Sequence, residues 1–191
     1  MATGALIPPA QLIGYFAKPT AVRPPWLKAP QVTEICSVAD CISRLDWDWI
    51  SEWRHNELGF YDTPELAWSG VPEPLRAACD LYAHAMLPVR FVGGVQEAFA
   101  IPGVNPIRRD GSFVRLGYDV VSREFEAGFG HSPLSCNGLA EEVPTNRHCL
   151  IATAAEAVAT GLTMEIPGRP LRGEPGPYHV VEVWRRPRRL S

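Results

Sequence analysis

The spacing of the apolar residues changes at Pro88, and this change limits the folds open to the chain. Before Pro88, apolar side chains recur every three or four residues, which is typical of helices; after it they alternate, which is typical of strands. The alternation is clearest over residues 113–122 (FVRLGYDVVS). Because helices come first and strands follow, the sequence predicts an α+β fold with a mostly antiparallel sheet.

Two helices are predicted in the first 70 residues. Ser37 followed by Asp40 resembles a capping box, and apolar residues continue at helical spacing until Gly59. Thr63 and Pro64 suit the N-cap and first turn of a short second helix.

A third helix is predicted to begin at Pro74 and to be ended by Pro88. Four apolar residues would share one face of it: Leu75, Cys79, Tyr82 and Met86. This spacing makes it the clearest helix that the sequence predicts.

The second half of the chain predicts about four to five strands and one helix. Residues 89–100 suggest a hairpin that turns at Gly93 and Gly94, and residues 178–184 (YHVVEVW) predict the last strand. Thr153 and Glu156 form a capping box for a helix over residues 153–163, which would cover the sheet.

The prolines divide the chain into an arm and a domain. Residues 1–33 contain six prolines and predict an extended arm lying on the body of the protein. Residues 34–191 predict a single α+β domain, with a helical part (34–88) and a sheet part (89–186). With 46% hydrophobic and 20% charged residues, the core should form without a disulfide or a metal ion.

Charge and hydropathy exclude several classes of function. The net charge of −3 argues against binding nucleic acid, which usually requires a basic face. No apolar run is long enough to span a membrane, and proline interrupts the apolar residues at the start of the chain. The five cysteines match no secreted disulfide framework. We therefore expect a soluble, cytoplasmic protein with reduced thiols.

The loop of residues 128–150 contains most of the candidate chemistry. His131, Cys136, His148 and Cys149 are zinc-ligand types, but their spacing differs from the tight pairs of zinc sites. Adjacent residues on an extended chain point in opposite directions, so His148 and Cys149 could not readily bind one ion. We predict neither a metal nor a cofactor.

Two functions remain as alternatives around this loop. Cys136 could act as a nucleophile, with His148 or His131 as its base and Asp119 orienting that base, in a small hydrolase or transferase. Asp119 at the end of its strand could instead line a polar pocket, in a small-ligand sensor or accessory subunit. No familiar catalytic motif is present. We favour an architectural loop and a protein that is not an enzyme.

An acidic segment suggests a recognition surface. Carboxylates surround Trp47, which points away from the apolar face of the first helix, and aromatic residues bordered by charge are typical of protein-binding patches. The residues of this predicted patch are Asp46, Trp47, Asp48, Glu52, His55 and Asp62. The alternative is a solvated helix face with Trp47 covered by the arm.

Residues 149–185, with CLIATAAEAVATGL followed by GPYHVVEVW, resemble the immunity proteins of bacterial polymorphic-toxin systems. The resemblance implies a compact α+β domain that inhibits a cognate toxin by binding it, and it assigns no functional residues. An acidic first half would suit a basic toxin as the protein partner.

Overall fold

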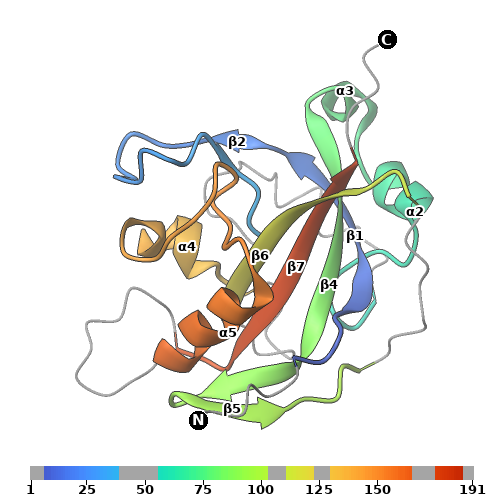
Figure 1. The fold of residues 1–191 in the computed structure, drawn as a ribbon. Coiled ribbons are helices and arrows are strands. Elements are labelled where there is room, and N and C mark those ends of the chain that lie inside the picture. The colour runs from blue at the N-terminus through green and yellow to red at the C-terminus, as the bar shows by residue number, and fades with distance from the viewer. Residues whose placement is uncertain (1–6, 39–55, 103–110, 123–129, 165–174, 187–191) are drawn as a thin grey trace.

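The computed structural model describes residues 7–38, 56–102, 111–122, 130–164 and 175–186. It confirms the α+β class: the sheet is antiparallel and five-stranded, and a second sheet has two strands. The strand order is β1-β4-β7-β6, with β5 also paired to β4 (Figure 1). The strands are β1 (Gln11–Pro19), β2 (Ala21–Val22), β3 (Glu34–Ile35), β4 (Cys79–Val92), β5 (Val95–Ala98), β6 (Val114–Ser122) and β7 (Tyr178–Arg186).

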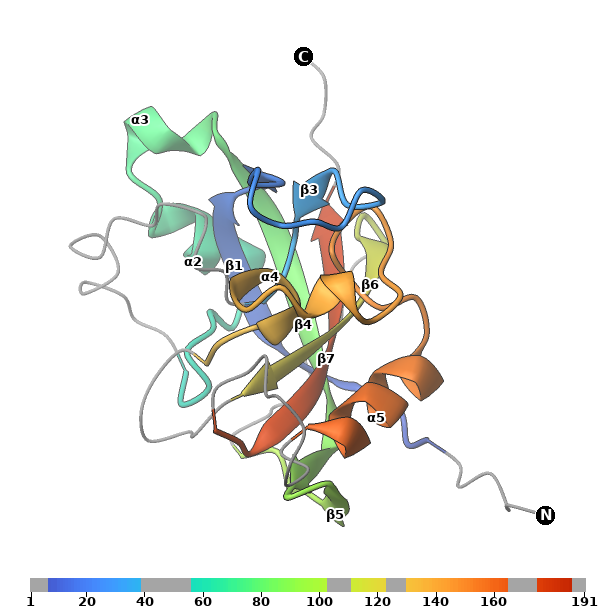
Figure 2. The ribbon, with the colours of Figure 1, turned by 90° about the vertical axis from the view of Figure 1, so that its left-hand side faces the viewer.

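The helices are short and lie around the sheet. In Figure 1, α2 lies beside β1 and α3 lies above the upper ends of the strands, whereas α4 lies beside β6 at the other side of the sheet. Figure 2 shows the longest described helix, α5, in front of β7. The helices are α2 (Pro64–Ser69), α3 (Glu73–Arg76), α4 (Pro133–Cys136), η1 (Leu139–Glu141) and α5 (Ala154–Thr163). None of the helices in the described ranges is long and apolar enough to cross a membrane.

Several local predictions are confirmed. The hairpin of β4 and β5 turns at Gly93-Gly94, where both glycines have positive φ. Thr63 caps α2 through the amide of Leu66, and Thr153 and Glu156 form the predicted capping box of α5. Strands β6 and β7 occupy the predicted positions. Each of these signals depends on neighbouring residues alone.

The long helix predicted after Pro74 is wrong. Helix α3 ends at Arg76, and residues 79–92 form the strand β4. Residues 79–87 are all buried, because β4 lies between β1 and β7 and core side chains pack on both of its faces. A strand buried on both faces has no polar alternation, and its apolar residues can match helical spacing by coincidence.

The predicted arm contributes to the sheet, and the predicted first helix cannot be assessed. Residues 11–19 of the arm form β1, which pairs with β4. Residues 39–55, which hold most of the predicted first helix, lie outside the described residues. The N-terminal part of the chain is thus packed with the sheet, as the fold class requires.

Gly117 allows the segment after α4 to approach the sheet. Its φ is +150°, and a Cβ at this position would lie 2.7 Å from the carbonyl oxygen of Ile151. The next residue, Tyr118, forms a backbone bridge with Ile151 in both directions, at 2.8 Å each. A side chain at residue 117 would therefore displace the segment that positions the polar site described below.

Candidate functional site

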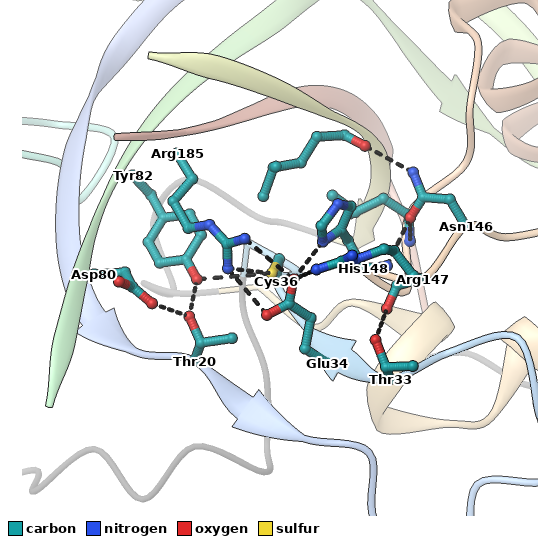
Figure 3. Close-up of polar contacts among 12 residues, drawn as sticks. Thr20, Thr33, Glu34, Cys36, Asp80, Tyr82, Asn146, Arg147, His148 and Arg185 are labelled. Carbon is teal, nitrogen blue, oxygen red and sulfur yellow. Dashed lines mark hydrogen bonds and ion pairs between the residues drawn. The ribbon is translucent and has the colours of Figure 1, made fainter. Parts of the chain in front are cut away.

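Strand β3 and the turn of residues 146–150 lie side by side at one end of β4 and β7. The amide of Glu34 donates to the carbonyl of Arg147 at 3.1 Å, and the amide of Cys36 donates to the carbonyl of His148 at 3.1 Å. Segments more than 100 residues apart in the sequence are thereby held together (Figure 3).

Asn146 fixes the shape of this turn. Its Oδ1 accepts hydrogen bonds from the amides of His148 at 2.9 Å and Leu150 at 3.3 Å, and its Nδ2 donates to the carbonyl of Leu116 at 2.7 Å. Asparagine commonly organises turns by bonding to nearby backbone groups. The last of these bonds joins the turn to β6.

Glu34 is the centre of a charged cluster. Its Oε1 lies 2.6 Å from Nδ1 of His148, and Arg185 of β7 donates to both carboxylate oxygens at 3.1 Å. These three side chains each expose 20% or less of their surface. The more exposed Arg147 lies 3.7 Å from Oε1. The bidentate contact with Arg185 is the strong form of a carboxylate–arginine pair.

The environment determines the charges in this cluster. Burial acts to raise the pKa of Glu34, but the hydrogen bonds and charge of Arg185 and the hydrogen bond from His148 outweigh it, so its pKa is lowered and the side chain is ionised. Burial lowers the pKa of His148, and the opposing effect of Glu34 is smaller. His148 is therefore neutral near pH 7 and donates its Nδ1 hydrogen to Glu34.

Cys36 borders the same cluster with its thiol protonated. Its Sγ lies 3.7 Å from the hydroxyl of Tyr82 and 3.8 Å from Nη1 of Arg185. Burial, followed by the charge of Glu34, raises the pKa of Cys36 to about 11. The thiolate is the nucleophilic form, so the sulfur of Cys36 is a weak nucleophile at neutral pH. We call Glu34, Cys36, His148 and Arg185 the Glu34 cluster.

A chain of hydroxyl groups extends from this cluster. The hydroxyl of Tyr82 is hydrogen-bonded to that of Thr20, which donates to Oδ2 of Asp80 at 2.5 Å. These bonds join β4 to Thr20, the residue between β1 and β2 (Figure 3). Burial raises the pKa of Tyr82, so its hydroxyl stays neutral.

Three members of the Glu34 cluster are metal-ligand types. Within the described ranges, Glu34, Cys36 and His148 are the single group of three such residues found with ligand atoms close together, all within 4.8 Å of one another. Oxygen, sulfur and imidazole nitrogen are the donors that zinc accepts.

A second polar cluster surrounds Asp119, which is fully buried. Its Oδ2 accepts hydrogen bonds from the hydroxyl of Ser132 at 2.5 Å and from the amide of Val38 at 2.7 Å. Its Oδ1 accepts no hydrogen bond from the described residues. Burial raises the pKa of Asp119 to about 6, although Ser132 and Val38 oppose the shift. Close by, Ser132 accepts a bond from Ser135, whose hydroxyl also bonds Ser37.

The structure places the predicted catalytic residues in different surroundings. Cys136 ends α4 and is half-buried, and His131 is exposed with its backbone paired to Ser122 of β6. His148 is bonded to Glu34, and Asp119 to Ser132. The structure thus places His148 near Cys36. It places Asp119 next to Ser132, near the start of the loop of residues 128–150.

The predicted acidic patch is described only in part. Asp62 is exposed, and its Oδ1 accepts a hydrogen bond from Asn56 at 3.0 Å. The other residues of that patch, Asp46, Trp47, Asp48, Glu52 and His55, lie outside the described residues.

Sequence reasoning missed Glu34, Cys36 and Arg185. The first two are two residues apart on an extended strand and so share a face, a spacing that could have pointed to them. Arg185 carries no local signal, because only the pairing of β7 with β4 brings it to Glu34.

Helices α2 and α3 and the residues beside them carry exposed apolar and acidic side chains. Leu66 is 45% exposed and Leu75 is 41% exposed. Exposed carboxylates accompany them at residues 62, 65 and 73. We call Asp62, Glu65, Leu66, Glu73 and Leu75 the α2–α3 surface. Helix α2 packs on the side of the sheet that carries Leu81 and Ala83, whereas Cys36 packs with Tyr82 on the other side, so α2 and the Glu34 cluster lie on opposite faces.

Comparisons of the chain with protein-family models, curated proteins and solved structures found no match. The function is therefore argued from the residues of the structure.

Proposed function

We propose that the protein is a non-enzymatic binding module that recognises a basic partner protein through the α2–α3 surface. The observation that carries this proposal is the exposure of Leu66 and Leu75 among carboxylates. Interfaces commonly combine apolar contacts with a polar rim. An inhibitor of a bacterial toxin, in the manner of an immunity protein, is a function of this kind.

The charge of this part of the chain favours a basic partner. Residues 56–78 contain four carboxylates and one cation, Arg76, so this segment is acidic. The whole chain is also acidic, with a net charge of −3. The guanidinium of Arg76 donates to the carbonyl of Val71 at 3.0 Å. Glu65 and Glu73 form no ion pair among the described residues. Such unpaired charge increases the rate of association with an oppositely charged protein.

The α2–α3 surface is held by the sheet. Ala67 of α2 and Val71 are buried against Tyr15 and Leu81, and Thr63 caps α2. Little ordering is then required on binding, which lowers the entropic cost of association.

The four thiols in the described ranges also favour binding over catalysis. Cys36 has a raised pKa, and Cys79 and Cys149 are buried. Cys136 is half-buried, and the imidazole of His148 is committed to Glu34. The carboxylates predicted around Trp47 would extend an acidic surface, and that remains a prediction.

The test is partner capture from the native host with the wild type and a Leu66→Asp/Leu75→Asp variant, followed by quantitative mass spectrometry. We expect a basic protein to be captured by the wild type, lost with the variant and weakened by added salt. Val95→Asp is the matched control, because Val95 is 59% exposed on β5, at the far end of the sheet from α3 (Figure 1). If both variants capture the same proteins as the wild type, the proposal is wrong.

A further inference from the structure

We propose that Glu34, Cys36 and His148 form a zinc site that joins β3 to the turn of residues 146–150. The three side chains supply one carboxylate oxygen, one sulfur and one imidazole nitrogen. Zinc accepts each of these donor types, and three protein ligands leave the fourth tetrahedral position for water. The proposal is independent of the binding function, because the Glu34 cluster and the α2–α3 surface lie on opposite faces of the sheet.

The backbone aligns the three ligands. Glu34 and Cys36 alternate along an extended segment and share one face. His148 is opposite them, because its carbonyl accepts the amide of Cys36 and Asn146 holds the turn. The ligand atoms already lie within 4.8 Å of one another, so only small side-chain rotations separate them from zinc-binding distances.

Zinc would replace two hydrogens in this arrangement. The Nδ1 hydrogen of His148 now lies between the imidazole and Oε1 of Glu34, which are 2.6 Å apart. When zinc takes its place, the imidazole proton moves to Nε2, and the thiol proton of Cys36 is released to solvent. Each ion bound therefore releases one proton, and the thiolate and carboxylate together neutralise the ion.

Arg185 is compatible with the ion as a supporting residue. Its Nη1 donates to Oε2 of Glu34 at 3.1 Å, which leaves Oε1 to bind zinc. Ligating carboxylates are commonly held by a further hydrogen bond of this kind. The ion would displace the second bond, from Nη2 to Oε1 at 3.1 Å, and the contact of Arg147 with the same oxygen at 3.7 Å.

The experiment uses the full chain, reduced and stripped with chelator, and titrates it with Co²⁺, a spectroscopic substitute for zinc. We expect one equivalent to bind and to give a thiolate-to-cobalt charge-transfer band with tetrahedral visible bands, both abolished by an equivalent of Zn²⁺. Cys36→Ser should lose the charge-transfer band. His148→Gln should keep the band and weaken Co²⁺ binding at least about tenfold.

Cys136→Ser is the matched control, because Cys136 is the most exposed of the described thiols and does not belong to the site. It should retain the band in full. Circular dichroism checks that each variant is folded, and the rise in the melting temperature that Zn²⁺ gives in the wild type should be smaller in His148→Gln at the same Zn²⁺ concentration. The proposal is overturned if folded wild type gives no thiolate-to-cobalt band, or if the band is lost in Cys136→Ser and kept in Cys36→Ser.

Discussion

The carboxylates on the two faces of the sheet have opposite surroundings. Glu34 is largely buried and bonded to Arg185 and His148, whereas Glu65 and Glu73 of the α2–α3 surface are exposed and form no ion pair among the described residues. A buried charge must be satisfied within the fold, and an exposed charge remains free to meet a partner. The comparison supports our proposal that the α2–α3 surface serves recognition, whereas the ion pairs of Glu34 hold elements of the fold together.

The largest effect is expected from removing the cation of the Glu34 cluster. Arg185→Leu would leave the carboxylate of Glu34 without its main counter-charge, and we expect the free energy of unfolding to fall by about 3 kcal/mol. Urea denaturation measures this loss. The control is Arg115→Leu, because Arg115 is half-exposed and lies 3.6 Å from Glu182, and it should cost less than about 1 kcal/mol. Equal losses of stability would show that the more buried pair of Arg185 and Glu34 stabilises the fold no more than the pair of Arg115 and Glu182.

A second prediction concerns how the free energy of unfolding depends on pH through the buried carboxylate of Asp119. Asp119 has a pKa of about 6 in the fold, against an ordinary value of 3.8, so the unfolded chain ionises first. The stability contributed by its protonated form should therefore be lost as the pH rises from about 4 to about 6, by about 3 kcal/mol. Glu34, whose pKa is lowered, contributes in the opposite direction, with stability lost as the pH falls below its ordinary 4.5.

Asp119→Asn separates the two carboxylates. The variant should lack the decrease in stability between about pH 4 and 6 and keep the loss at lower pH, as measured by urea denaturation across this range. An unchanged profile in the variant would mean that Asp119 is not the group responsible.

A smaller effect is expected from removing the cap of α2. Thr63→Ala deletes the hydroxyl that accepts the amide of Leu66 at 3.2 Å, and should cost about 1 kcal/mol of stability. Because α2 carries Leu66, partner capture should also weaken. Thr153→Ala at the cap of α5 should cost a similar amount of stability and leave capture unchanged.

The smallest effect on stability is expected at the α2–α3 surface itself. Leu66→Asp and Leu75→Asp replace exposed side chains, so each should change the free energy of unfolding by no more than about 0.5 kcal/mol. Thermal melts of the variants used for partner capture check this expectation. A large loss would assign the two leucines to the fold and remove the contrast between the two faces.

Local signals were predicted well because they need no distant residue. The caps at Thr63 and Thr153 and the turn at Gly93-Gly94 are completed within four residues of chain. The candidate site was not predictable in this way. Glu34, His148 and Arg185 are separated by more than 100 residues or by several elements, and only the β4–β7 pairing and the 146–150 turn bring them together.

The sequence by itself determined the α+β class, the alternating strands β6 and β7 and the capped helix α5, because side-chain periodicity and capping are local properties. Tertiary structure decided that residues 79–92 are a strand, since pairing on both edges and burial on both faces outweighed an apparent helical spacing. It also decided that His148 meets Glu34 and Cys36 rather than Cys136, because a buried carboxylate is stable only where the fold supplies its counter-charge.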